Sequence, residues 1–341
     1  MSENSRLYDN QGNWESTSSG IENSEYETKT RKKRFSYLTN IALFLLTFFT
    51  TTLAGVAWAN RDPYQLDNFT IGLTYSALIL LIISTHEFGH YFAAKYHKIS
   101  VTLPYYIPFP FLFLNPFGTM GAVIKMKTRT QSRKSLFDVG VAGPIAGWVT
   151  SLIILVIGFL TLPPVSFLYT IHPEYATQGI ATTGFSFGYN IIFWIFEKIF
   201  TSSPNVFMPP MNEVYHYPFL CVGWFGLLIT ALNMMPIGQL DGGHISYAMF
   251  GKKHKYLAYT IFGLLLFFGL AGFLPLIGVT FELGSVNWLI WILLIFFLIK
   301  IKHPPICHDI DTPLDNTRML IGWFSYFIFV TSFCPIPFTG I

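Results

Sequence analysis

The residues best suited to chemistry are two histidines that flank a glutamate in the sequence His86-Glu87-Phe88-Gly89-His90. On a helix, positions four apart lie on one face, so His86 and His90 can hold one metal ion between them. Two neutral imidazoles suit zinc, and Glu87 is placed to act as a general base toward the attacking water. Such residues are costly inside an apolar stretch and are functional candidates by default. The alternative is a packed cluster of hydrogen-bonded polar side chains.

A catalytic zinc site needs a third protein ligand, and the best candidate is Asp241. Asp241 lies eleven residues before Lys252, and the two histidines lie nine and five residues before Lys95. At about 1.5 Å per helical residue, both sets fall roughly 8–16 Å from the basic residues that follow them. His244, three residues after Asp241, is the rival ligand because imidazole binds zinc well.

The composition places the scaffold for these side chains in a membrane. The 341 residues are 52% hydrophobic, 18% aromatic and only 11% charged, whereas soluble chains carry roughly 25% charged residues. So few charges argue against a soluble enzyme and against a disordered scaffold. The net charge of +3 is too small and too scattered to imply nucleic-acid binding. Three cysteines do not make a secreted disulfide framework.

Long uncharged stretches predict the membrane spans, since a bilayer core of about 30 Å needs roughly 20 helical residues. Seven stretches qualify: Phe35–Asn60, Phe69–Thr85, Val139–Leu162, Val214–Leu240, Tyr256–Phe281, Leu283–Ile299 and Met319–Phe333. We therefore predict an all-α membrane protein with about seven transmembrane helices. A further apolar stretch, Val101–Phe117, contains four prolines. Proline blocks a regular helix, so we expect a re-entrant or interfacial segment there.

The basic residues predict the orientation of these helices. Arg31-Lys32-Lys33-Arg34 directly precedes the first span, which places the N-terminus in the cytoplasm. With alternating spans, the cytoplasmic segments hold nineteen of the twenty-one Lys and Arg residues. The candidate zinc site then faces the cytoplasmic side of the membrane, and Pro163–Glu213 is the longest external loop.

The paired motifs resemble the site-2 protease family of intramembrane zinc metalloproteases. They are His86-Glu87-Phe88-Gly89-His90 and Asn233-x-x-Pro236-x-Gly238-x-Leu240-Asp241-Gly242-Gly243. The resemblance covers about residues 69–250 and implies a three-helix catalytic core. It implies that Asp241 is the third zinc ligand and Glu87 the general base. It also implies that Asn233 helps to hold the substrate backbone or the transition state.

The residues Gly118, Thr119, Met120 and Gly121 resemble the family's short re-entrant β-hairpin, which is thought to pair with an unwound substrate strand. The stretch Thr119–Thr128 also alternates loosely, as a strand on a sheet edge does. An exposed strand edge offers backbone hydrogen bonds to an unwound peptide. These residues are therefore expected to bind substrate.

Other stretches resemble the family more broadly. Gly143-Pro144-Ile145-Ala146-Gly147 is similar to the Gly-Pro signature of the middle core helix, although the two glycines equally suit helix packing. No stretch has the size or composition of an inserted PDZ domain. The likeness is thus to the PDZ-less type, whose bacterial, cyanobacterial and plastid members share sequences such as His303-Pro304-Pro305 and Pro313-Leu314-Asp315 after the core.

We predict four segments along the chain. Residues 1–34 form a disordered polar cytoplasmic tail, and residues 35–68 form the first transmembrane helix and a short external loop. Residues 69–250 form the catalytic core, and residues 251–341 form the C-terminal transmembrane helices.

The resemblance implies a zinc metalloendopeptidase that cleaves the transmembrane segments of membrane proteins. Such cleavage serves regulated intramembrane proteolysis or the clearance of membrane remnants. The cofactor implied is Zn²⁺, and the partners implied are single-pass transmembrane substrates and the lipid bilayer. The expected location is a bacterial inner membrane, which the protein crosses several times. The oligomeric state, the particular substrate and the activating signal stay open.

Two other functions remain as alternatives. A zinc protease of the type that processes prenylated proteins also has a histidine-glutamate-histidine helix, but its third ligand is a glutamate on a later helix. The candidate for that ligand, Glu282, is predicted on the outer side of the membrane. A divalent-metal transporter or sensor would use the same ligands as the protease. It should have polar residues along a continuous path, whereas here they cluster at one depth.

The sequence gives less reason to assign a metal-binding role to the remaining histidines. His303, Cys307, His308 and Asp309 form a metal-like cluster whose spacing fits no zinc pattern. We expect the other histidines outside the motifs at interfaces or in loops; they are His97, His172, His216 and His254.

Overall fold

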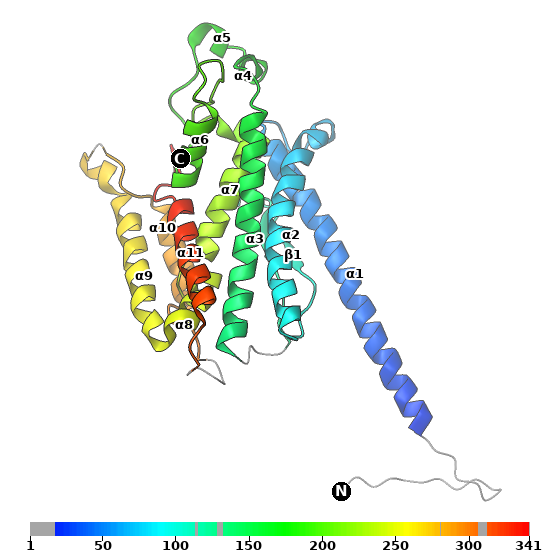
Figure 1. Ribbon diagram of the computed structural model, residues 1–341. Coiled ribbons are helices and arrows are strands. Elements are labelled where there is room, and N and C mark those ends of the chain that lie inside the picture. Colours follow the sequence, from blue (N-terminus) through cyan, green and yellow to red (C-terminus); the bar gives the residue numbers. More distant parts are fainter. Residues whose placement is uncertain (1–17, 113–114, 128–131, 280, 306–311, 341) are drawn as a thin grey trace, which may run out of the picture.

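The computed structural model describes residues 18–112, 115–127, 132–279, 281–305 and 312–340, and this part of the chain is mostly helical (Figure 1). The α-helices are α1 (Ser18–Trp58), α2 (Leu73–Tyr96), α3 (Arg133–Leu160), α4 (Ser166–Ile171), α5 (Tyr175–Gln178), α6 (Ile191–Phe200), α7 (Pro218–Asn233), α8 (Asp241–Phe250), α9 (His254–Ala271), α10 (Asn287–Leu294) and α11 (Asn316–Ser332). Two small antiparallel sheets pair β1 (Tyr105–Pro108) with β2 (Thr119–Val123) and β3 (Ser186–Phe187) with β4 (Phe338–Thr339).

Four of the described helical stretches are long and apolar enough to cross a membrane. They are Tyr37–Trp58, Leu66–Tyr96, Arg133–Leu160 and Asp241–Ala271. Two further apolar helices, Pro218–Asn233 and Asn287–Phe297, are shorter. The membrane class is thus supported by length and composition, and the count of seven spans stays a prediction.

Helix α1 begins earlier than the sequence predicted. It runs from Ser18 to Trp58, so residues 18–34 are helical, whereas we had predicted a disordered tail over residues 1–34. Adding residues to an existing helix costs much less than nucleating one, and the apolar part of α1 supplies the nucleus. Figure 1 shows the first half of α1 projecting away from the other helices.

The stretch Val214–Leu240, predicted as one span, does not form one continuous helix. Helix α7 ends at Asn233, and Asp241 begins the separate helix α8. A Cβ on Gly242 would lie 2.0 Å from the carbonyl oxygen of Met234, so only glycine lets the chain fold back this closely. The third candidate ligand therefore starts a new helix instead of finishing an old one.

Helices α2, α3 and α7 pack together at the centre of the molecule. Helix α2 packs chiefly against α3, which also contacts α7 and α8. Apolar side chains with no exposed surface fill the space between the three central helices, such as Ile79 of α2, Leu155 of α3 and Leu220 of α7. This packing fixes the position of the histidines on α2 relative to α3.

The β1–β2 hairpin is attached to the first two long helices. Tyr106 pairs with Ala122 across the two strands. The side-chain amide of Asn40 on α1 donates a hydrogen bond to the carbonyl of Pro104 at 2.7 Å. The hydroxyls of Ser84 on α2 and Tyr106 lie 2.7 Å apart. These contacts hold the hairpin beside the helix that carries the two histidines.

Strand β2 covers Thr119–Val123, which is shorter than the predicted Thr119–Thr128, and Thr128 lies outside the described residues. Among the described strands, β2 pairs only with β1, so its other edge has no strand partner. Whether the hairpin enters the membrane stays a prediction.

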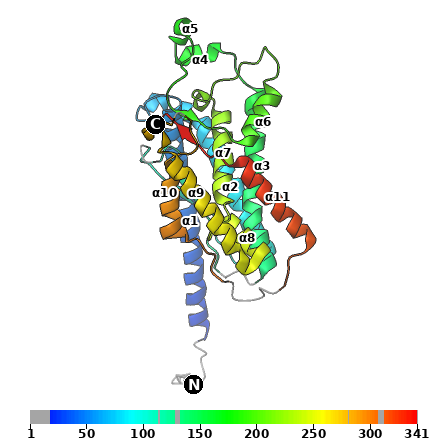
Figure 2. The same ribbon diagram turned by 90° about the vertical axis from the view of Figure 1, so that its left-hand side faces the viewer.

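The C-terminal helices pack around the central ones. Helix α9 continues from α8 and contacts α10, while α11 contacts α3 and α7 (Figure 2). The guanidinium of Arg318 on α11 donates to both carboxylate oxygens of Asp138 on α3, at 2.8 and 2.6 Å. Helices α4 and α5 lie at the end of the molecule opposite to α8 (Figure 1).

Candidate metal centre

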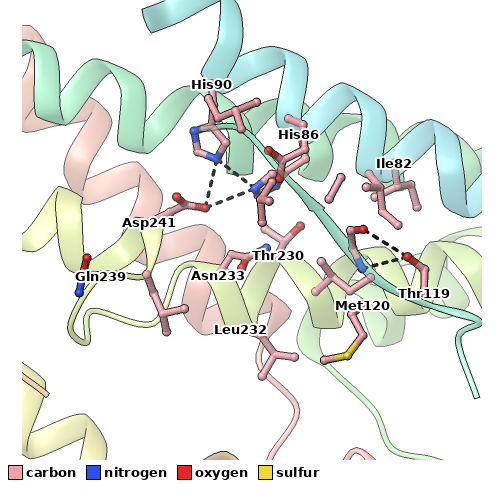
Figure 3. Close-up of a pocket in the computed structure, with 18 of the residues that line it drawn as sticks. Ile82, His86, His90, Thr119, Met120, Thr230, Leu232, Asn233, Gln239 and Asp241 are labelled. Atoms are coloured by element: carbon pink, nitrogen blue, oxygen red, sulfur yellow. Dashed lines mark hydrogen bonds and ion pairs between the residues drawn. The ribbon is translucent and has the colours of Figure 1, made fainter. Parts of the chain in front are cut away.

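The two histidines of α2 and the first residue of α8 meet at one point, as Figure 3 shows. The Nε2 atoms of His86 and His90 lie 3.1 Å apart. Each lies 3.3 Å from Oδ2 of Asp241. Both histidines are buried, and 17% of the Asp241 side chain is exposed. Residues separated by more than 150 positions in the sequence thus direct three potential ligand atoms to one place.

The spacing of these three atoms fits a tetrahedral zinc site. Ligands at about 2.0–2.1 Å from a zinc ion are separated from one another by about 3.3 Å in a tetrahedron. The three observed separations of 3.1, 3.3 and 3.3 Å match this geometry. Two imidazole nitrogens and one carboxylate oxygen are also ligands that zinc takes in catalytic sites. The residues present therefore fit a zinc ion.

Helix α3 fixes the orientation of the histidine rings. The Nδ1–H of His90 donates to the carbonyl of Val139 at 2.7 Å, which leaves the Nε2 lone pair directed at the centre. A Cβ on Gly143 would lie 2.2 Å from His90 Nε2, and one on Gly147 would lie 3.3 Å from Cβ of His86. The two glycines of the Gly-Pro signature thus let the backbone of α3 lie directly against both rings.

The rival ligand His244 is directed elsewhere. Its Nδ1 lies 2.7 Å from Nε2 of His303, and the backbone N–H of His303 donates to Nε2 of His254 at 3.0 Å. His303 therefore belongs to a network of histidines. The other members of the metal-like cluster predicted around it, residues 307–309, lie outside the described residues.

Glu282, the third ligand expected for a prenyl-protein-processing protease, lines a different pocket. Its neighbours there include Gly188 and Cys334. Among the described residues, the group that could hold a metal with His86 and His90 contains Asp241 and not Glu282.

A cavity of about 550 Å³ opens beside the candidate centre. The predicted base Glu87 lines it and is only 8% exposed. The three candidate ligands and Asn233, the last residue of α7, line it as well. The hairpin contributes Thr119, Met120 and Gly121 to the wall. Eight of the nine predicted site residues therefore surround one space.

Gly118 is the predicted site residue that does not line this cavity. It has a positive φ of +74°, and a Cβ there would lie 2.4 Å from the carbonyl oxygen of Thr50 on α1. Its place is thus in the contact between hairpin and helix. Thr119 shapes the strand itself, because its hydroxyl donates to the carbonyl of Ile107 at 2.9 Å and accepts from the backbone N–H of Gly121 at 3.0 Å.

One group of candidate ligands was missed by the sequence analysis. His172 and His216 were expected only at interfaces or in loops, and Glu213 was not considered. The structure brings the three together, with their ligand atoms within 4.8 Å of one another. The two histidines are 44 positions apart, so no short motif joins them. The local signal is the Glu213-x-x-His216 spacing.

Comparison with known proteins agrees with the geometry of the centre. Residues 74–274, more than half of the chain, match peptidase family M50. The chain is 29% identical over 266 residues to "Probable zinc metalloprotease EGY2, chloroplastic" of Oryza sativa subsp. indica, covering 77% of this chain and 43% of the relative. It is 26% identical over 304 residues to the Arabidopsis thaliana protein of the same name, covering 86% of this chain and 48% of the relative.

The chain thus spans less than half the length of these curated relatives. The family match includes α2, α3, α7 and α8, and with them His86, His90 and Asp241. The resemblance seen in the sequence is confirmed: the chain belongs to peptidase family M50, the family of the site-2 proteases.

Proposed function

We propose that this protein is a zinc metalloendopeptidase that cleaves the transmembrane segments of other membrane proteins. The observation that carries the proposal is the position of Glu87. It lies between two histidines that meet Asp241, and it lines a cavity bordered by the strand β2. The printed names of the relatives, which are probable zinc metalloproteases, support the same chemistry.

Each residue of the centre has a distinct role in this proposal. His86, His90 and Asp241 hold the zinc ion, which when bound supplies a Lewis acid for the scissile carbonyl. The Glu87 carboxylate accepts the proton of the attacking water and returns it to the leaving amine. Glu87 is only 8% exposed and faces the cavity, where the attacking water would lie.

The hairpin provides the binding surface for the substrate backbone. A peptide bond inside a helix is shielded, and its carbonyl already accepts a hydrogen bond, so cleavage requires local unwinding. The edge of β2 that pairs with no described strand offers replacement hydrogen bonds to the unwound segment. A Cβ on Gly121 would meet no atom within 4 Å, which leaves room for an approaching strand. Asn233 lines the same cavity and holds the substrate backbone or the transition state.

The membrane arrangement is part of the same proposal. We place the N-terminus in the cytoplasm, with seven spans, a re-entrant hairpin and the active site toward the cytoplasmic side. The gathering of basic residues before the first span and after α2 and α8 supports this orientation. The core of residues 69–250 carries the chemistry, and single-pass proteins are the proposed substrates. For the host membrane we keep the bacterial inner membrane, although the relatives are named chloroplastic.

The decisive experiment compares the wild-type protein with Glu87→Gln during co-expression with candidate single-pass membrane proteins. Loss of a general base costs typically 10²–10⁴-fold, so the cleavage product seen with the wild type should disappear with Glu87→Gln. A chelator should abolish the same product. The measurement is an immunoblot of a substrate tagged at both ends.

Glu282→Gln is the matched control, because Glu282 lines a separate pocket. It should cleave as the wild type does. Full cleavage by Glu87→Gln would refute the role of this residue. Chelator-sensitive metal uptake into proteoliposomes, without any cleavage, would favour the transporter instead.

A further inference from the structure

A second group of metal-ligating side chains lies at the end of the molecule opposite to α8. His172 directly follows α4. Glu213 directly precedes the short helix η2 (Val214–His216), which ends with His216. Figure 1 shows α4 and α5 at the top of the molecule and α8 at the bottom. The three residues belong to the connection between α3 and α7, and none lies in the four candidate spans.

The three ligand atoms of this group are spaced much like those at the cavity. Nε2 of His172 lies 3.1 Å from Nε2 of His216. Oε2 of Glu213 lies 3.5 Å from the His216 nitrogen and 3.9 Å from the His172 nitrogen. Ligands at about 2.0–2.2 Å from a tetrahedral ion are separated by about 3.3–3.6 Å. An inward movement of a few tenths of an ångström by Glu213 brings the set to that geometry.

The group is buried, and its carboxylate lacks a partner. The Glu213 side chain is 2% exposed, that of His216 is fully buried, and that of His172 is 16% exposed. Among the described residues, Glu213 Oε2 has no hydrogen-bond partner. A hydrogen bond between the two imidazoles alone would leave this oxygen unpaired, which is costly for a buried polar atom.

Neighbouring side chains orient the candidate ligands. The Tyr175 hydroxyl donates to Oε1 of Glu213 at 2.8 Å, which leaves Oε2 directed at the imidazoles. The side-chain amide of Asn212 donates to the same Oε1 at 3.3 Å. Nδ1 of His172 lies 3.3 Å from Oε1 of Glu174, so its Nε2 can face the centre. Metal-ligating histidines characteristically carry such a carboxylate on the second ring nitrogen.

We propose that His172, Glu213 and His216 form a second metal site, separate from the cavity, that binds a divalent transition-metal ion of the zinc class. Two imidazole nitrogens and a carboxylate oxygen are the ligands that zinc takes most readily in the absence of cysteine. The ion joins the α4–α5 segment to the start of α7. It therefore acts as a cross-link within the connection between α3 and α7, and its binding stabilises the fold.

The test measures the zinc content of the purified 341-residue chain that carries His86→Ala and His90→Ala, so that the cavity set no longer competes for the ion. The protein is stripped with a chelator, incubated with Zn²⁺ and freed of excess ion by gel filtration. Mass spectrometry of the eluted protein should find about one zinc per chain. Adding His172→Ala should remove it, and this variant changes the most exposed of the three ligands. In the chain with an intact cavity, His172→Ala should lower the count from about two to about one.

The matched control is His97→Ala in the same background. His97 pairs with Asp138 at 2.8 Å but belongs to no three-ligand group among the described residues, so the zinc count should stay unchanged. Zn²⁺ should also raise the unfolding midpoint of the background protein and leave that of the His172→Ala variant unchanged. Circular dichroism verifies that each variant is folded. The proposal is overturned if the folded background protein binds no zinc, or if His172→Ala and Glu213→Gln both keep it.

Discussion

The described part of the chain contains two sets of two histidines and one carboxylate, and the two sets differ in their surroundings. In both sets the two Nε2 atoms lie 3.1 Å apart. The set on α2 and α8 lines a cavity of about 550 Å³ together with Glu87. The set at Glu213 is not among the residues that line this cavity, and the Tyr175 hydroxyl covers the second oxygen of its carboxylate. Similar ligands thus suit different purposes, because catalysis also needs an open space and a free base.

The means of support also differ between the two sets. At the cavity, backbone atoms of α3 position the histidines, through the Val139 carbonyl and the bare Cα of Gly143. In the Glu213 set, side chains position the ligands: Tyr175 contacts Glu213, and Glu174 contacts His172. The Val139 carbonyl is present whatever side chain residue 139 carries, whereas the contact at residue 143 requires glycine. A single substitution can remove the support of the Glu213 set.

The largest effect should come from Asp241→Asn, which tests whether the cavity set is the catalytic one. Loss of an outer-shell partner alone costs about 10- to 100-fold in metal affinity or activity, so loss of a direct ligand should exceed that range. Cleavage of a co-expressed substrate should therefore become undetectable, while the zinc at the Glu213 set remains. Asp315→Asn is the matched control, because Asp315 caps α11 and Asn caps helices equally well. Cleavage within tenfold of the wild type would contradict the assignment of Asp241.

An intermediate effect is expected from Gly143→Ala, which tests the backbone support of the cavity set. The added methyl would lie 2.2 Å from His90 Nε2, and overpacking of this kind costs about 1–3 kcal/mol. At 1.4 kcal/mol per tenfold, cleavage should fall by about 5- to 140-fold. In the control Gly263→Ala, the new methyl meets no atom within 4 Å, so the cleavage rate should not change. Wild-type zinc content and activity in Gly143→Ala would show that α3 does not constrain His90.

The smallest effect is expected from Tyr175→Phe, which tests the side-chain support of the other set. Loss of the 2.8 Å hydrogen bond to Glu213 should cost about 0.5–1.5 kcal/mol, or up to about tenfold in zinc affinity. Competition with a fluorescent zinc chelator, in the protein without His86 and His90, measures this affinity. Tyr169→Phe on α4 is the control and should bind zinc as before. If Tyr175→Phe binds zinc with unchanged affinity, the Tyr175 hydroxyl does not help to position Glu213 for zinc binding.

The sequence predicted the parts of the fold and site that depend on local spacing. The pairing of His86 with His90 follows from the period of one helix. The meeting with Asp241 was expected from counting the rise per residue from the flanking basic residues, a count that applies across elements when both are predicted to cross the same membrane. The break before Asp241 was not predicted, because an uninterrupted apolar composition hides the place where Pro236 and the glycines turn the chain.

Local spacing and helix depth could not predict contacts between loops that are distant in the sequence. His172 and His216 are 44 positions apart and lie in no periodic element that would set their relative depth. Gly118 was grouped with its neighbours because a family resemblance treats the motif as one unit. A motif does not show that one glycine faces α1 while the next one borders the cavity.

The contact between His90 and the bare backbone at Gly143 has a mechanical consequence. The imidazole occupies the volume where residue 143 would carry a side chain, so α3 cannot turn about its own axis without driving another side chain into the ring. This contact therefore restricts rotation of α3 relative to α2. The cavity walls that this contact does not fix include the hairpin and the turn that joins α7 to α8.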